Sequence, residues 1–164
     1  MVARKGGIVE VDDRFEVQEK EFFLYPTFEH QQIDAILPQY QPDLMDTMNE
    51  KPANRQLIFP SYAVVEDVYK IHDLAKLEAL QDYYIWTHDS IAMRFNWNKD
   101  RTLYLLTLRV YKLPKVHTMP WNDSYSGCTS WITLSEELST EGATPVLSDV
   151  EFAKQADKIR SILN

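Results

Sequence analysis

At 164 residues the chain is long enough to bury a hydrophobic core, and its 45% hydrophobic and 12% aromatic composition excludes an intrinsically disordered protein. The formal net charge of −8 argues against nonspecific binding to nucleic acid, because phosphate contacts require cations. A single cysteine, Cys128, excludes an internal disulfide framework and fits a reducing compartment. No apolar run approaches the roughly 18 residues of a bilayer span, and no signal-peptide core is present. We therefore expect one cytoplasmic domain over residues 1–164, without membrane contact.

The N-terminal half of the chain is predicted to alternate short strands with polar connections. Apolar residues at alternate positions, bounded by turn-forming residues, define each strand. Thr27 can cap a helix that Pro38 ends, and three prolines among mostly polar residues predict a long loop at 38–56. The predicted strands are Ile8–Val11, Phe15–Tyr25 and Leu57–Ile71, the last with Pro60 at an edge or bulge.

The C-terminal half contains the two strongest local patterns. Leu103–Leu113 alternates and is apolar on both sides at its start, which predicts a central strand ended by Pro114. Ser148 and Glu151 have the spacing of a capping box, which predicts a final helix. The expected buried stripe of that helix is Phe152, Ala156, Ile159 and Leu163. The remaining predicted elements are a helix from Asp73 to about Tyr84, strands at Ile91–Phe95 and Thr129–Leu134, and a hairpin turn at Asn96–Arg101.

An arginine, Arg109, stands in the middle of the predicted central strand. Burying an unpaired charge is costly, so this side chain should meet a carboxylate or open onto a groove that holds a ligand. Arg109 also belongs to a basic window, Arg94–His117, which holds six lysines and arginines against one acidic residue. Aromatic residues are interleaved with these cations, as on surfaces that hold phosphates and stack bases. The alternative is a solvated hairpin whose cations pair with the acidic remainder of the chain.

Three other arrangements of residues bear on chemistry. A strand-to-helix corner at 25–31 gathers polar and aromatic groups, and such corners often position functional side chains. Asp12 or Asp13 followed by Gln18-Glu19-Lys20 superficially matches a restriction-type nuclease pattern, although an exposed acidic strand explains the same residues. Cys128 would need an adjacent histidine to act as a nucleophile. Because the histidines lack metal-ligand spacing, we expect no metal site. We also expect no cofactor and no catalytic residue.

Several stretches in order along the chain resemble an uncharacterised bacterial family, domain of unknown function 1802 (DUF1802). The matching residues are Arg4-Lys5-Gly6-Gly7-Ile8, Phe23-Leu24-Tyr25-Pro26-Thr27 with Glu29-His30-Gln31, Leu108-Arg109-Val110-Tyr111, Tyr125-Ser126-Gly127-Cys128 with Ser130-Trp131, and Pro145-Val146-Leu147-Ser148. The resemblance implies no established activity. It implies association with restriction-type endonuclease domains, which would make the chain a recognition module in DNA defence with a nuclease as partner.

We therefore expect an α+β fold, with a small mixed or mostly antiparallel β-barrel of the PUA-like kind and two or three peripheral helices. The expected function is noncatalytic recognition of DNA, a nucleotide or a modified base. The alternatives are a metal-dependent nuclease of the restriction type and a protein-interaction domain. The expected ligand-binding residues are Arg4, Lys5, Tyr25, Thr27, His30, Gln31, Arg94, Arg109, Tyr111, Tyr125 and Trp131. We predict that the corner at 25–31, Arg109 and the loop at 125–131 converge on one concave surface.

Overall fold

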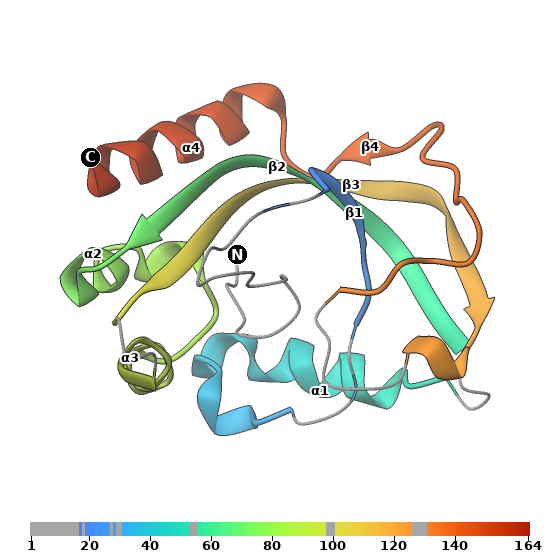
Figure 1. Cartoon of the computed structure of the whole chain (residues 1–164), viewed down its shortest axis with the longest axis horizontal. Helices are drawn as coiled ribbons and strands as arrows, with labels where there is room; N and C mark the ends of the chain where they lie inside the picture. Colours follow the sequence, from blue (N-terminus) through green and yellow to red (C-terminus); the bar gives the residue numbers. More distant parts are fainter. Residues whose placement is uncertain are drawn as a thin grey trace.

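A four-stranded antiparallel sheet forms the centre of the fold (Figure 1). The computed structural model describes Val17, residues 19–26, Phe28, and residues 31–52, 56–97, 101–125 and 131–164. The strands are β1 (Glu21–Leu24), β2 (Gln56–Ile71), β3 (Leu103–Pro120) and β4 (Thr144–Pro145), in the spatial order β1-β2-β3-β4. The α+β class is thus confirmed. The closed barrel expected from the sequence is wrong for the described residues, because β1 and β4 are the two edges of an open sheet.

The hairpin of β2 and β3 confirms the two best-defined predicted strands and extends beyond them. The described β3 continues past Pro114, which the sequence suggested would end it, to Pro120. This is possible because the register is irregular there: one residue of β2, Pro60, stands between the pairs Phe59–His117 and Ser61–Lys112, opposite four residues of β3. A proline lacks the N–H that a regular ladder needs, so irregular pairing accommodates both prolines.

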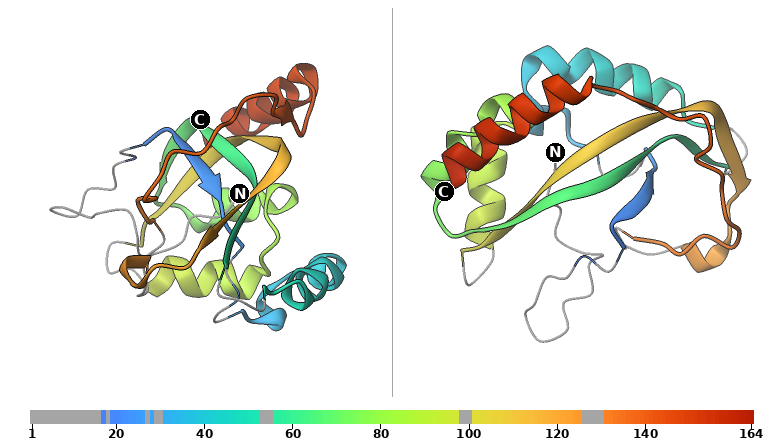
Figure 2. Two further views of the ribbon diagram at one scale, coloured as in Figure 1. Left: turned by 90° about the vertical axis from the view of Figure 1, so that its right-hand side faces the viewer. Right: turned by 90° about the horizontal axis from the view of Figure 1, so that it is seen from above.

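Helices accompany the arched hairpin on both of its sides in Figure 1. Helices α2 (Leu74–Glu78) and α3 (His88–Trp97) lie below one end of the arch, and α4 (Asp149–Leu163) lies above that end. Helix α1 (Gln41–Asn49) lies below the middle of the arch, and Figure 2 shows α4 extending alongside β2 and β3. None of the described helices is both long and apolar enough to cross a bilayer.

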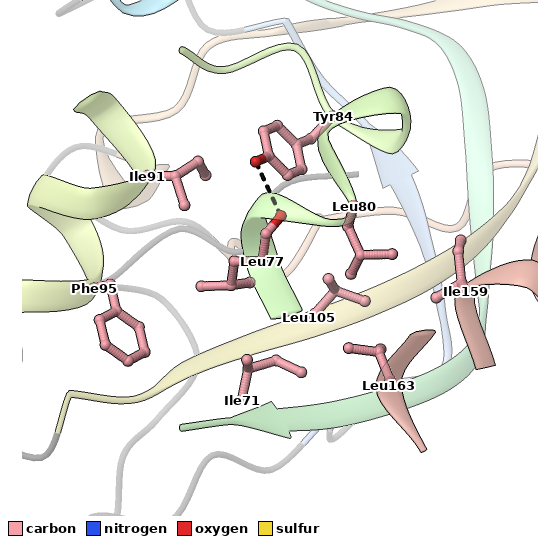
Figure 3. Packing of buried hydrophobic residues seen from close by; sticks show 9 residues of the cluster. All are labelled: Ile71, Leu77, Leu80, Tyr84, Ile91, Phe95, Leu105, Ile159 and Leu163. Atoms are coloured by element: carbon pink, nitrogen blue, oxygen red, sulfur yellow. Dashed lines mark hydrogen bonds between the residues drawn. The ribbon is translucent and has the colours of Figure 1, made fainter. Parts of the chain in front are cut away.

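Cluster 1, one of two buried hydrophobic clusters, joins this end of the hairpin to three helices (Figure 3). The Tyr84 hydroxyl donates a hydrogen bond of 3.0 Å to the Leu77 carbonyl, so its polar group is satisfied inside the cluster. Burial raises the pKa of Tyr84, which keeps the phenol neutral. The members of cluster 1 are Ile71, Leu77, Leu80, Tyr84, Ile91, Phe95, Leu105, Ile159 and Leu163.

Cluster 2 holds the other end of the hairpin. Its buried residues are Leu57, Phe59, Met119 and Tyr125. Residues after β3, among them Trp121, Ile132 and Leu134, pack against it together with Phe23 and Tyr25 from β1 and its continuation. The chain from 131 to 143 thereby returns along this end of the sheet before it forms β4 (Figure 1).

Helix α4 agrees most closely with its predicted form. The Ser148 hydroxyl accepts from the Glu151 amide and the Glu151 carboxylate accepts from the Ser148 amide, which is the expected capping box. The hydrogen bonds from Ser148 lower the pKa of Glu151. Arg160 secures the helix further along, donating to Asp67 at 2.9 Å. Asp67 reaches this position beside a β-bulge, since Glu66 has no partner between the pairs Val65–Leu108 and Asp67–Thr107.

Several predicted elements differ from the structure. The described part of the helix expected between Thr27 and Pro38 contains only a 3₁₀ turn, η1 (Ile33–Ala35), and Pro38 begins a second one, η2 (Pro38–Tyr40). The long loop expected at 38–56 contains η2 and α1, because Pro42 lies in the first helical turn, where a proline needs no hydrogen-bond partner. No described residue of 131–134 is in a strand, and β4 pairs with β3 instead.

The region between β2 and β3 also departs from its predicted form. Asp73 caps α2 as expected, accepting from the Ala75 amide at 2.9 Å, but this helix ends at Glu78 and is followed by the 3₁₀ turn η3 (Gln81–Tyr83). The strand and hairpin turn expected at 91–101 are wrong in their described part, since 88–97 form α3. Ile91 and Phe95 are four residues apart and both buried, so helical periodicity prevails over alternation.

Candidate functional site

Three aromatic side chains lie in a row across β1, β2 and β3. We call them the aromatic platform: Phe23, Tyr62 and Tyr111. The register pairs Phe23 with Tyr62 and Tyr62 with Tyr111, so all three project from the same face. The rings of Tyr62 and Tyr111 are stacked, with centroids 4.8 Å apart and planes 10° apart. The Phe23 ring follows at 6.2 Å from Tyr62. All three residues are partly buried. The facing sides of the Tyr62 and Tyr111 rings cover each other, so a further ring can only extend this stack at its ends.

The platform continues into cluster 2 through further aromatic contacts. The ring of Phe59 lies 5.8 Å from Phe23 and 6.1 Å from Tyr25. Tyr125 is buried in the same cluster, and its hydroxyl donates to the Ser135 hydroxyl and accepts from the Ser135 amide. A series of ring contacts therefore connects the predicted binding residues Tyr111 and Tyr25, whereas Tyr125 is a buried member of the cluster against which Tyr25 packs.

Arg109 lies on the same face of β3 as Tyr111, one alternation away, and is only 7% exposed. Its guanidinium donates to Asp149 at 2.7 Å and to the Ser148 carbonyl at 3.4 Å. The same group lies 4.7 Å from the Phe152 ring centroid and 5.8 Å from that of Tyr111. Of the two surroundings expected for this arginine, a carboxylate or a ligand-holding groove, the structure shows the carboxylate, and the arginine joins the start of α4 to the middle of β3.

Two other predicted residues lie away from the platform. The guanidinium carbon of Arg94, on α3, lies 3.8 Å above the ring centroid of Trp86, which precedes that helix, in a cation–π contact. Trp131 packs edge-on against Phe22, with ring centroids 4.4 Å apart. Phe22 alternates with Phe23 along β1, so Trp131 contacts the opposite face of the sheet from Tyr111. The predicted convergence on one surface is wrong for Trp131.

The remaining predicted residues add little to the geometry. Gln31 is partly buried in the connection before η1. Arg4, Lys5, Thr27 and His30 lie outside the described residues.

Sequence reasoning missed half of the surroundings of the platform. Tyr62 and Phe23 were assigned to strands, but only the register shows that Tyr62 adjoins Tyr111 and that Phe23 adjoins Tyr62. His117 is also beside the platform: its ring lies 6.2 Å edge-on from Phe23, and its Nε2 lies 2.8 Å from the Ser139 carbonyl. Alternation within a strand indicates a face but not the partner across it, so no local signal could have found this group.

The charge around the platform is mixed. Lys112 and Lys115 are exposed on β3, and Glu21 lies on the platform face beside Phe23. Burial, the neighbouring Tyr111 and the Glu21 carboxylate all raise the pKa of Tyr62, in that order of importance. Tyr62 therefore keeps its hydroxyl proton at neutral pH and can donate a hydrogen bond to a ligand.

Residues suited to metal or nucleophilic chemistry are not gathered in the part of the chain that the structure describes. Within that part, no group of three histidine, cysteine, aspartate or glutamate side chains is placed to hold a metal ion. From the nuclease-like pattern, Glu19 and Lys20 are exposed, whereas Asp12, Asp13 and Gln18 fall outside the described residues, as does Cys128.

Fold and surface together define an α+β domain with a partly exposed aromatic row on an open antiparallel sheet. Residues 1–158 match the family model "Domain of unknown function (DUF1802)", so the chain belongs to this family, as its motifs indicated. No curated protein and no solved structure matches the chain.

Proposed function

We propose that this protein is a noncatalytic recognition module that stacks bases of a single-stranded nucleic acid, or an unpaired base of DNA, on the aromatic platform. The observation that carries the proposal is the stacked and partly exposed pair Tyr62–Tyr111, extended by Phe23. Aromatic rings displayed on a sheet face are a common means of binding single strands, because every base has a π-face.

The charges of the molecule favour selective rather than general binding. Lys115 provides an exposed cation on the strand that carries Tyr111, and it alternates with His117, whose ring contacts Phe23, so it lies on the platform face and can meet a backbone phosphate. The net charge of −8 repels phosphates elsewhere on the chain. Affinity must then come chiefly from contacts with bases, which suits a module that recognises an unpaired or modified base. By analogy with the family resemblance, we place it in the bacterial cytoplasm beside a restriction-type nuclease as partner.

The first test replaces a platform ring and measures oligonucleotide binding by fluorescence anisotropy at low salt. Tyr111→Leu removes the stacking surface but keeps an apolar side chain, so we expect affinity for single strands to fall about tenfold. Tyr104→Leu is the matched control, because Tyr104 is a partly buried tyrosine that alternates to the other face of β3. The control variant should bind like the unaltered protein.

Salt dependence separates stacking from charge in the same experiment. Lys115→Ala should weaken the binding of all oligonucleotides alike and flatten its dependence on salt, because it removes one phosphate contact. If no single strand or unpaired base binds at low salt, or if Tyr104→Leu weakens binding as much as Tyr111→Leu, the proposal is wrong. A protein-interaction domain would then be the better description of the aromatic row.

A further inference from the structure

A cavity of about 250 Å³ lies between the middle of β3, the first turns of α4 and the turns η2 and η3. It is smaller than the roughly 300–1,000 Å³ of sites for drug-sized ligands, so its occupant must be a small group. Its lining is aromatic on several sides and polar at a few points. Among the residues that line it are Tyr40, Asp82, Tyr83, Thr107, Phe152 and Gln155.

Thr107 is a buried polar group without a partner at this cavity. The residue is 5% exposed, and its hydroxyl has no hydrogen-bond partner among the described residues. Leaving such a group unsatisfied is unfavourable, because it loses its bonds to water on folding. The hydroxyl oxygen is closed to a water-sized group, so a ligand in the cavity supplies the missing hydrogen bond only when the Thr107 side chain turns toward it.

The cavity adjoins the aromatic platform along one face of β3. Thr107, Arg109 and Tyr111 alternate along this face. Phe152 lines the cavity, and the Arg109 guanidinium lies 4.7 Å from its ring centroid. The same guanidinium lies 5.8 Å from the ring centroid of Tyr111. Arg109 and Phe152 thus lie between the cavity and the Tyr111 end of the platform.

We propose that the cavity receives one planar heteroaromatic base of the strand that lies on the platform, an inference that rests on the proposed function. Recognition of an extruded base needs flat apolar walls and hydrogen-bonding groups for the base edge. Tyr83 and Phe152 provide rings, and Asp82, Gln155 and Thr107 provide hydrogen-bonding groups. A carboxylate only accepts hydrogen bonds, so Asp82 selects a base edge that carries N–H donors.

An abasic scan of a short single strand tests this inference. Each nucleotide in turn is replaced by an abasic one, and anisotropy gives the loss of affinity at each position. In the unaltered protein, we expect the abasic substitution at one position to lower affinity about tenfold. In Gln155→Phe, whose larger side chain fills the cavity from the exposed surface of α4, the same substitution should leave affinity unchanged. Ser161→Phe, also at an exposed position of α4, is the matched control and should keep that tenfold loss.

Thr107→Val gives a second, independent measurement. Valine preserves the shape of the side chain without the unpartnered hydroxyl, so the melting temperature of the free protein should rise by about 3 °C. The same variant should weaken the base-dependent position of the scan. If the abasic scan of Thr107→Val is the same as that of the unaltered protein, the hydroxyl does not contact a base, which would contradict the inference.

The outcomes distinguish this inference from the proposed function. If oligonucleotides bind and Tyr111→Leu weakens them, but the scan is the same in Gln155→Phe as in the unaltered protein, the cavity receives no base and the platform proposal stands. If no oligonucleotide binds at all, both are wrong.

Discussion

Phe59→Ala is expected to lower the free energy of unfolding by about 3–5 kcal/mol, the range found for truncating a large buried aromatic residue. Phe59 is only 2% exposed and is among the largest fully buried side chains of the described residues. Its ring contacts Phe23 and Tyr25, so the substitution leaves a cavity between cluster 2 and the platform. Among the platform residues, Phe23 contacts Phe59 directly, so a substitution at Phe23 should be the one whose effect on stability is not additive with Phe59→Ala.

Urea denaturation followed by circular dichroism measures this effect. Phe22→Ala is the control, because Phe22 is only partly buried and projects from the other face of β1. Its loss should be clearly smaller, about 1–2 kcal/mol for partial burial of an aromatic ring. Equal losses in the two variants would show that cluster 2 is not a packed core and that it does not support the platform.

Asp149→Ala is expected to lower the free energy of unfolding by about 2 kcal/mol. The Asp149 carboxylate is 97% exposed, yet it pairs at 2.7 Å with the buried guanidinium of Arg109. Removing it leaves a charge inside the protein whose remaining hydrogen-bond acceptor, among the described residues, is the Ser148 carbonyl. Arg109→Met should be less destabilising than Asp149→Ala, because it removes the buried charge itself and keeps an unbranched side chain between Phe152 and Tyr111.

Asp157→Ala is the matched control for Asp149→Ala. Asp157 also lies on α4 and pairs with an arginine, but Arg160 is not buried, and exposed pairs contribute less than about 1 kcal/mol. Thermal and urea unfolding should therefore separate the two aspartate variants. If Asp149→Ala is as mild as Asp157→Ala, water replaces the carboxylate at Arg109, and the pair does not fasten α4 to β3.

The sequence correctly predicted those helices and strands that are determined by residues close together along the chain. Helix α4 has its capping box and its buried stripe within one segment, and β2 and β3 alternate over most of their length. Helix α3 was mistaken for a strand because 91–95 is short enough to satisfy both periods. The prolines were misjudged for a related reason: whether Pro42 or Pro114 interrupts an element depends on the hydrogen bonds it meets there, and those depend on the tertiary fold.

Only those features of the candidate site that lie within one β-strand could be predicted from the sequence. Arg109 was rightly expected to meet a carboxylate, because the cost of an unpaired buried charge holds in any fold. Tyr111 was selected for its position in a basic and aromatic strand, but its stacking partner Tyr62 is 49 positions away and becomes adjacent only through the register. The cavity beside it is likewise formed by residues from separate elements, which no spacing in the sequence brings together.

Photocrosslinking tests the central claim, that bases stack on the aromatic platform, most directly. Single strands containing iodouracil are irradiated in complex with the protein, and mass spectrometry identifies the crosslinked peptides. The platform predicts crosslinks to Phe23, Tyr62 or Tyr111, which Tyr111→Leu reduces. Trp97, 72% exposed at the end of α3, is the internal comparison, because any exposed ring could capture a weakly bound strand. Crosslinks confined to Trp97, or spread over unrelated surfaces and unaffected by Tyr111→Leu, would contradict the account.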